Sequence, residues 1–190
     1  YARYLAAFCG ELQLEGFALL GHSLGGAVAQ ALAVEHPERV RRLILLASAA
    51  PDGHVTPEEH YAALEAFKGN RELLGQALAA TMPAARPDYF EGIVDDALAM
   101  RHEAYVGNGR ALHDFDVSGR TARYEGPVLV IRGALDLPHL ITEEIAIRTA
   151  QAYRNSQPEL WDDVGHSPQI EAPERFRKAL ADFLEEPAMT

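Results

Sequence analysis

Residues 17–25 read FALLGHSLG and stand directly before an alanine-rich stretch with helical spacing. The apolar run at 17–20 predicts a strand, and a helix follows so closely that the chain must turn from one to the other through Ser23. Such a turn places that residue in strained backbone geometry, and we expect Gly21 and Gly25 to keep side chains from colliding across it. The hydroxyl of Ser23 is therefore predicted to stand out at the carboxyl edge of a sheet.

Two later residues could activate this hydroxyl. A serine hydroxyl is a poor nucleophile at neutral pH and needs a base within hydrogen-bond reach, which a third group orients. Asp136 follows the apolar run at 127–131 in a Gly-x-x-Asp sequence, and His166 follows a short strand-like piece at 159–161. Both candidates therefore come just past the end of a predicted strand.

The order serine, acid, histidine resembles the α/β-hydrolase superfamily, and the resemblance extends over nearly the whole chain. The Gly165-His166 pair and the trailing EAPERF at 171–176 are in register with it. It implies that Ser23 is the nucleophile, that His166 is the general base and that Asp136 orients the histidine. The backbone N–H of Leu24 would then be one donor of the oxyanion hole.

Asp52 is the alternative acid. Some members of the superfamily place the acid after the sixth strand, and Asp52 comes soon after the apolar run that ends at Ala47. However, the Pro-Asp-Gly sequence at 51–53 is also ordinary turn chemistry, which favours Asp136.

The alternation of strands and helices predicts an α/β fold with a doubly wound, mostly parallel sheet. Residues 51–120 interrupt this alternation with a helix-rich and turn-rich stretch, which resembles the cap insertion of the superfamily. We expect a core formed by 1–50 and 121–190 and a helical cap formed by 51–120. Strands are expected at 17–20, 43–47, 127–131 and 158–161, and helices at 2–13, after Ser23 as far as His36-Pro37, at 142–153 and from Pro173.

The departure from the superfamily lies at the front of the chain. A complete member has several strands before the serine, and a His-Gly type loop among them supplies the second oxyanion donor. Here the first predicted strand leads directly into Ser23, so only the C-terminal strands of the fold are expected, with that donor absent. A preceding segment, a second chain or a truly shortened domain could account for this. Loss of one donor typically lowers turnover about 100- to 1000-fold.

Composition limits the function further. The 190 residues are 48% hydrophobic, enough for one domain with a sizeable core, and the net charge of −11 disfavours nucleic acid as a partner. No stretch is long and apolar enough to span a membrane. Cys9 is the only cysteine, so an internal disulfide is impossible; we expect a buried thiol and a cytoplasmic location.

The histidines outside the predicted triad carry no metal-site pattern, and neither a metal nor a cofactor is expected. His22, which precedes the nucleophile, is interpreted as a packing residue. Five others are interpreted as surface residues: His54, His60, His102, His113 and His139.

The sequence thus predicts a cofactor-independent serine hydrolase that forms an acyl-enzyme with a small or medium, largely apolar ester, lactone or related acyl compound. A nucleophilic serine argues against epoxide hydrolases and dehalogenases of this fold, which use aspartate. Acyltransferases, thioesterases, enol-lactonases, carbon–carbon hydrolases of ring-cleavage products and cofactor-free haloperoxidases share the triad and stay open. A ligand-binding receptor without catalysis is the alternative from another class.

Overall fold

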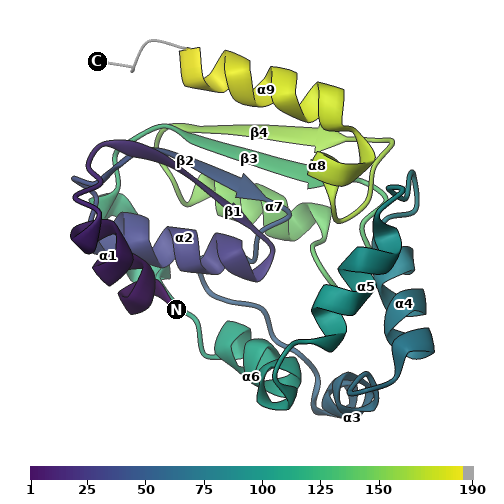
Figure 1. Cartoon of the computed structure of the whole chain (residues 1–190). Helices are drawn as coiled ribbons and strands as arrows, with labels where there is room; N and C mark the ends of the chain where they lie inside the picture. The colour runs from purple at the N-terminus through teal and green to yellow at the C-terminus, as the bar shows by residue number, and fades with distance from the viewer. Residues whose placement is uncertain (186–190) are drawn as a thin grey trace.

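The computed structural model describes residues 1–185 and has four parallel strands in one open sheet (Figure 1). The strands lie side by side in chain order, so β1 and β4 are the edge strands of the described sheet. They are β1 (Phe17–His22), β2 (Val40–Leu46), β3 (Val128–Gly133) and β4 (Ser156–Trp161). This architecture confirms the predicted α/β fold with a parallel sheet.

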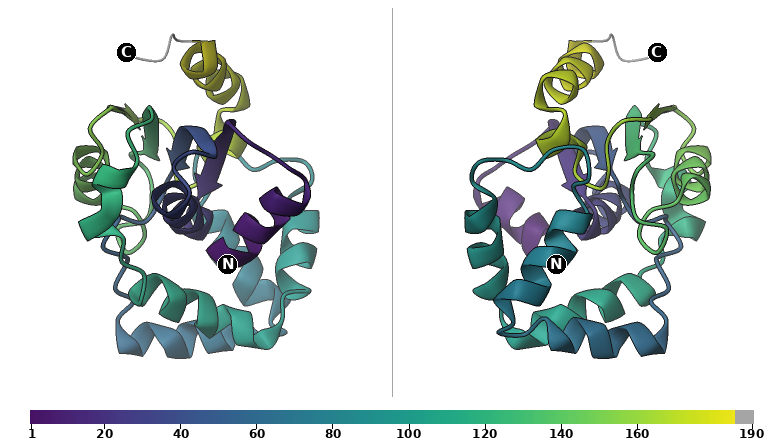
Figure 2. Two further views of the ribbon diagram at one scale, coloured as in Figure 1. Left: turned by 90° about the vertical axis from the view of Figure 1, so that its left-hand side faces the viewer. Right: turned by 90° about the vertical axis from the view of Figure 1, so that its right-hand side faces the viewer.

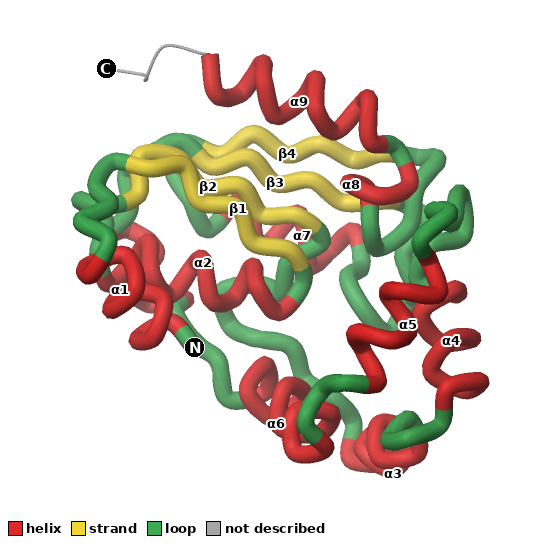
Figure 3. The backbone as a smooth tube through the Cα atoms, viewed as in Figure 1, coloured by secondary structure: helices red, strands yellow, loops and turns green. Residues whose placement is uncertain are grey.

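Helices cover both faces of the sheet, as the tube view shows (Figure 3). One face packs against α1 (Ala2–Glu11), α2 (Leu24–Glu35) and α7 (Glu143–Gln151), and the other against α9 (Pro173–Glu185). A four-residue helix that the sequence did not predict, α8 (Pro168–Glu171), precedes α9. Coverage on both faces is the usual condition of a parallel sheet, whose central strands are apolar throughout.

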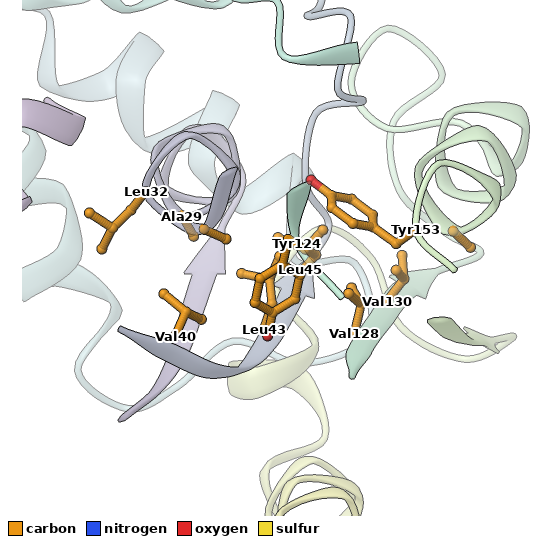
Figure 4. Close-up of a cluster of buried hydrophobic side chains, with 11 residues drawn as sticks. Ala29, Leu32, Val40, Leu43, Leu45, Tyr124, Val128, Val130 and Tyr153 are labelled. Carbon is orange, nitrogen blue, oxygen red and sulfur yellow. The ribbon is translucent and has the colours of Figure 1, made fainter. Parts of the chain in front are cut away.

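The two central strands show how one apolar run serves two cores. Leu43 and Leu45 of β2 point into a cluster with Ala29 and Leu32 of α2, Val128 and Val130 of β3 and Tyr153 (Figure 4). Ile44 and Leu46 alternate with them and pack on the other face, in the cluster that includes Trp161 and Phe183. Each such fully buried side chain stabilises the fold by roughly 1.5–3 kcal/mol.

Strand β2 begins at Val40, three residues before the predicted strand. Two arginines at its start fit the alternation of exposed and buried side chains along the strand. Arg41 is exposed, while Arg42 is buried with its guanidinium 5.3 Å from the centre of the Phe183 ring. An arginine can cover apolar surface in this way with its stem and stack its planar head on an aromatic ring. The two charged residues therefore belong to the strand, and β2 starts before them at Val40 rather than after them.

The helix-rich segment predicted at 51–120 lies between β2 and β3 and is called the cap segment below. In Figure 1 α4 and α5 stand beyond the ends toward which the strands point, and Figure 2 shows α3 and α6 at the end of the molecule opposite α9. That the cap segment forms a domain separate from the core stays a prediction. No helix within residues 1–185 could cross a membrane. The cap helices are α3 (Glu58–Ala66), α4 (Arg71–Ala80), α5 (Phe90–Leu98) and α6 (His102–His113), and a 3-10 helix follows at Ser118–Arg123.

Candidate active site

Ser23 is the single residue between β1 and α2, and its backbone is strained. Its φ is 53° and its ψ is −121°, a conformation that side-chain-bearing residues rarely adopt. The amide of Ser23 donates to the carbonyl of Leu46 at the end of β2 (3.0 Å), which fixes the turn to the sheet. Residues held in such conformations cost about 1–3 kcal/mol each and cluster at functional sites.

The glycines around this turn only partly follow the prediction. A Cβ on Gly21 would lie 2.3 Å from the carbonyl oxygen of Gly25, so Gly21 is needed as expected. The expectation for Gly25 was wrong, because a Cβ there would meet no atom of residues 1–185 within 4 Å apart from the adjoining backbone of its own helix. The second required glycine is Gly26, which faces the sheet and would place a Cβ 2.1 Å from Oγ of Ser48. The close approach thus lies between α2 and the loop after β2.

His166 and Asp136 form a buried hydrogen-bonded pair. Nδ1–H of His166 donates to Oδ2 of Asp136 over 2.8 Å, and the two residues are only 8% and 6% exposed. Oδ1 of Asp136 is buried and has no hydrogen-bond partner within residues 1–185. With Nδ1 engaged, Nε2 is the nitrogen left to accept a proton, as a general base requires.

Close backbone contact brings the loops that carry these two residues together. A Cβ on Gly133 would lie 2.1 Å from the carbonyl oxygen of Gly165 and 2.3 Å from that of Val164. The amide of Leu135 also donates to the carbonyl of Val164 (2.9 Å). The Gly-x-x-Asp sequence therefore has a steric reason: only glycine lets the acid loop approach the loop that carries His166, called the histidine loop below (residues 162–167).

Asp52, the alternative acid, lies elsewhere. Its carboxylate is on the surface and pairs with Nη1 of Arg148 on α7 at 2.9 Å. The structure thus joins His166 to Asp136 and joins Asp52 to an exposed arginine, which favours Asp136 as the acid. The catalytic role of either carboxylate stays a prediction.

His22 connects the Ser23 turn with the histidine loop. Its Nε2–H donates to the backbone carbonyl of His166 (2.8 Å), and the two ring centres are 5.0 Å apart. Ser23 therefore directly follows a residue whose side chain contacts His166, although no hydrogen bond joins its own Oγ to His166 within the described chain. Catalytic hydrogen bonds are often long until substrate binds.

The sequence interpretation of His22 as mere packing missed this hydrogen bond. Burial lowers the pKa of His22 to about 4, and the positive charge that His166 carries when protonated acts in the same direction. His22 is thus neutral near pH 7. Adjacency to Ser23 was the one signal in the sequence, and it did not reveal the partner.

The remaining histidines lie mostly on the surface, and no group of histidines, cysteines and acidic residues within 1–185 could hold a metal ion. His54 is the exception among them. It is half-buried, and burial lowers the pKa of its imidazole. Cys9 is a buried free thiol, as predicted.

Leu24 is the first residue of α2 and directly follows Ser23, and its role as an oxyanion donor stays a prediction. Beside it runs a groove of about 560 Å³ between α1, α2 and the outer edge of β1. The groove is apolar and includes Tyr1, Tyr4, Leu5, Phe8, Leu20 and Leu24.

Known proteins are similar to this chain in sequence and in fold. A family model described as the alpha/beta hydrolase family matches residues 1–179. A 2-hydroxymuconate semialdehyde hydrolase from Pseudomonas sp. (strain CF600) is 31% identical over 189 residues, which are 92% of this chain and 64% of the relative. A pyrethroid hydrolase from Sphingobium wenxiniae is 30% identical over 186 residues, which are 90% of this chain and 64% of the relative. The chain thus spans a little under two thirds of these relatives.

Solved structures are similar over almost the whole chain. An enol-lactonase from Burkholderia xenovorans LB400 superposes with a TM-score of 0.80 at 25% identity, covering 97% of this chain and 72% of that one. An esterase from Exiguobacterium antarcticum gives a TM-score of 0.83 at 21% identity with the same coverage. Together with the parallel sheet and the strained strand-to-helix turn, the match over residues 1–179 shows that the chain belongs to the alpha/beta hydrolase family.

Proposed function

We propose that the protein is a serine hydrolase that cleaves a small or medium, largely apolar ester, lactone or related acyl compound through an acyl-enzyme. The observation that carries the proposal is the buried hydrogen bond between His166 and Asp136, on a loop that His22 connects to the strained turn at Ser23. Ser23 as nucleophile, Asp136 as acid and His166 as base then follow one another along the chain in the order that acyl transfer on this fold uses, each on a loop after a strand.

In the proposed reaction, Nε2 of His166 takes the proton of the Ser23 hydroxyl as its oxygen attacks a carbonyl carbon. Asp136 holds the imidazole in the required tautomer and stabilises its protonated form. The N–H of Leu24 donates to the oxyanion that develops in the tetrahedral intermediate. His166 then protonates the leaving group, and a water molecule activated by the same histidine releases the acyl group from Ser23.

The relatives support hydrolysis as the reaction class. Those reported above are hydrolases, and their names indicate 2-hydroxymuconate semialdehyde, a pyrethroid, an enol-lactone or an ester as the substrate. A second candidate reaction is hydrolysis of a carbon–carbon bond in a ring-cleavage product, which the 31% identity to the semialdehyde hydrolase favours. Both reactions use the same serine, histidine and aspartate.

We further propose that additional polypeptide covers the groove beside Leu24 and supplies a second oxyanion donor. Two observations support this. Within the described chain β1 pairs with β2 alone, and the exposed aromatic side chains of Tyr4 and Phe8 flank the groove. An unpaired strand edge readily accepts another strand. A preceding segment or a second chain could provide it.

The experiment uses the protein at its full length. Burst release of 4-nitrophenol from short-chain 4-nitrophenyl esters, and covalent labelling by a fluorophosphonate probe located by peptide mass spectrometry, test the nucleophile. We expect labelling at Ser23, and we expect Ser23→Ala to abolish it and to lower turnover about 10⁶-fold. Ser118→Ala, on a remote surface, is the matched control. Turnover retained by Ser23→Ala refutes the serine mechanism, whereas bound ester without any burst favours the receptor alternative.

A further inference from the structure

Glu171 at the end of α8 is a buried carboxylate that the sequence analysis did not single out for a role. Its Oε1 accepts hydrogen bonds from the backbone N–H groups of Gly165 (2.9 Å) and Ser167 (3.2 Å), which flank His166 on both sides. Its Oε2 accepts from the backbone N–H of Ala84 (2.9 Å), which belongs to the cap segment. A carboxylate only accepts hydrogen bonds, so it matches three donors at once.

The stretch that contains Ala84, residues 81–84 after α4, also touches the histidine loop directly; it is called the cap linker below. The amide of His166 donates to the carbonyl of Thr81 over 2.9 Å. A Cβ on Gly165 would lie 2.4 Å from Cδ of Pro83, so the two backbones are pressed together. The cap linker thus reaches the backbone of His166 both directly and through Glu171.

The side chain of His166 is fixed only at one end. Nδ1 is held by Asp136, whereas the direction of Nε2 also depends on where the backbone of His166 lies. That backbone is held by Thr81 through its amide, by His22 through its carbonyl and by Glu171 through the two neighbouring amides. Removing the carboxylate would leave three N–H groups without their acceptor, two of them next to His166.

We propose that Glu171 is a positioning residue that ties the histidine loop and the cap linker to one carboxylate and thereby aims His166 at Ser23. The inference rests on the proposed serine hydrolase function. It also makes the cap segment part of the catalytic geometry, because the same side chain fixes both. A displacement of about 1 Å in a catalytic group lowers the rate about 100-fold.

The test compares Glu171→Gln with Glu174→Gln in the full-length protein. Glutamine keeps one acceptor oxygen and puts an NH₂ donor in place of the other, so it cannot accept from both the histidine loop and Ala84. Glu174 is exposed and pairs with Arg177 on α9, so its replacement removes a carboxylate nearby without touching the loop. We expect kcat to fall 10- to 100-fold in Glu171→Gln with KM changed less than about threefold, and no change in the control.

Hydrogen–deuterium exchange provides a readout that does not need turnover. We expect Glu171→Gln to raise exchange at the amides of both the cap linker and the histidine loop, although about eighty residues separate them. Faster exchange in only one of the two segments overturns the proposed link. Faster exchange in both with an unchanged kcat makes Glu171 a purely structural residue and also overturns the proposal.

Two further results are distinguishable from these. If the wild-type protein neither turns over esters nor reacts with the fluorophosphonate probe, the proposed function fails, while the exchange pattern still tests the link.

If Glu171→Gln does not fold, Glu171→Asp replaces it, because aspartate keeps the charge but withdraws the carboxylate by one methylene. We expect a smaller loss of kcat from aspartate, and an unchanged kcat refutes the proposal.

Discussion

The two sides of the Ser23 turn differ in how completely they are packed. On the side of β3 and β4, Gly133 touches the carbonyl of Gly165, and both Asp136 and His166 are buried. On the side of β1, a Cβ at Gly25 would meet no other segment of the described chain within 4 Å, and the nearby Tyr4 is 83% exposed. The described chain therefore has a closely packed side, which holds the His166–Asp136 pair of the proposed triad, and an open side, where Leu24 is the proposed oxyanion donor.

This difference follows from what each half must do. A histidine and a carboxylate act only in one orientation, and dense contacts between their loops fix that orientation. An oxyanion hole needs donors placed around a point in space, and the one donor proposed from the described chain is the N–H of Leu24. The packed side is thus where substitutions are expected to have large effects, and the open side is where they are expected to be tolerated.

The largest contrast is expected between two aspartates. Asp136→Asn keeps the shape of the buried side chain but changes the tautomer that His166 can adopt, so kcat should fall about 10⁴-fold. Asp52→Asn removes only an exposed ion pair with Arg148, worth about 0–1 kcal/mol, and should leave kcat within about twofold. Steady-state kinetics on a 4-nitrophenyl ester measures both.

Circular dichroism on each variant shows whether the protein stays folded. A large loss of kcat in folded Asp52→Asn, with Asp136→Asn nearly as active as the wild type, would reverse the assignment of the acid. It would also mean that the packed side of the turn is not where the histidine is oriented.

The second contrast is between glycines. Gly133→Ala would force a Cβ against two backbone carbonyl oxygens that cannot rotate away, so the free energy of unfolding should fall by about 3 kcal/mol. Gly25→Ala adds a Cβ in open space within α2, where alanine favours helix by up to about 1 kcal/mol over glycine. Urea unfolding followed by circular dichroism separates the two. A destabilised Gly25→Ala would show that the β1 side is more closely packed than its contacts indicate.

The sequence predicted the features that follow from local pattern. The apolar run around Leu45 predicted a buried parallel strand, and the sequence around Ser23 predicted a strand-to-helix turn. Features that depend on contacts between distant segments were not predictable. The role of Gly26 arises from Ser48, which lies 22 positions later, and the partner of Asp52 is an arginine on α7.

The hydrogen bonds around His166 illustrate the same limit. The position of His22 before the nucleophile was visible in the sequence, but its partner is a backbone carbonyl 144 positions away. A backbone carbonyl carries no residue identity, so no side-chain pattern could indicate it. Within residues 1–185, Glu171 likewise accepts hydrogen bonds only from backbone amides.

His22 belongs to β1 on the open side yet bonds to the histidine loop on the packed side, so its protonation tests how the two sides are joined. Its pKa is about 4 in the folded protein because of burial and the nearby His166, and about 6.5 when unfolded. The unfolded chain therefore binds this proton first as pH falls. The stability that neutral His22 contributes is fully present above pH 6.5 and is lost progressively as pH falls toward 4.

Comparison of the wild type with His22→Gln isolates this contribution, because glutamine keeps an N–H donor for the carbonyl of His166 and does not titrate in this range. Between pH 7.5 and pH 5 the wild type should lose about 2 kcal/mol more unfolding free energy than the variant, as measured by urea unfolding. Parallel curves would mean that water reaches His22 and that its bond to the histidine loop opens readily. The join between the two sides would then be loose, and the packed half of the site would hold His166 without help from β1.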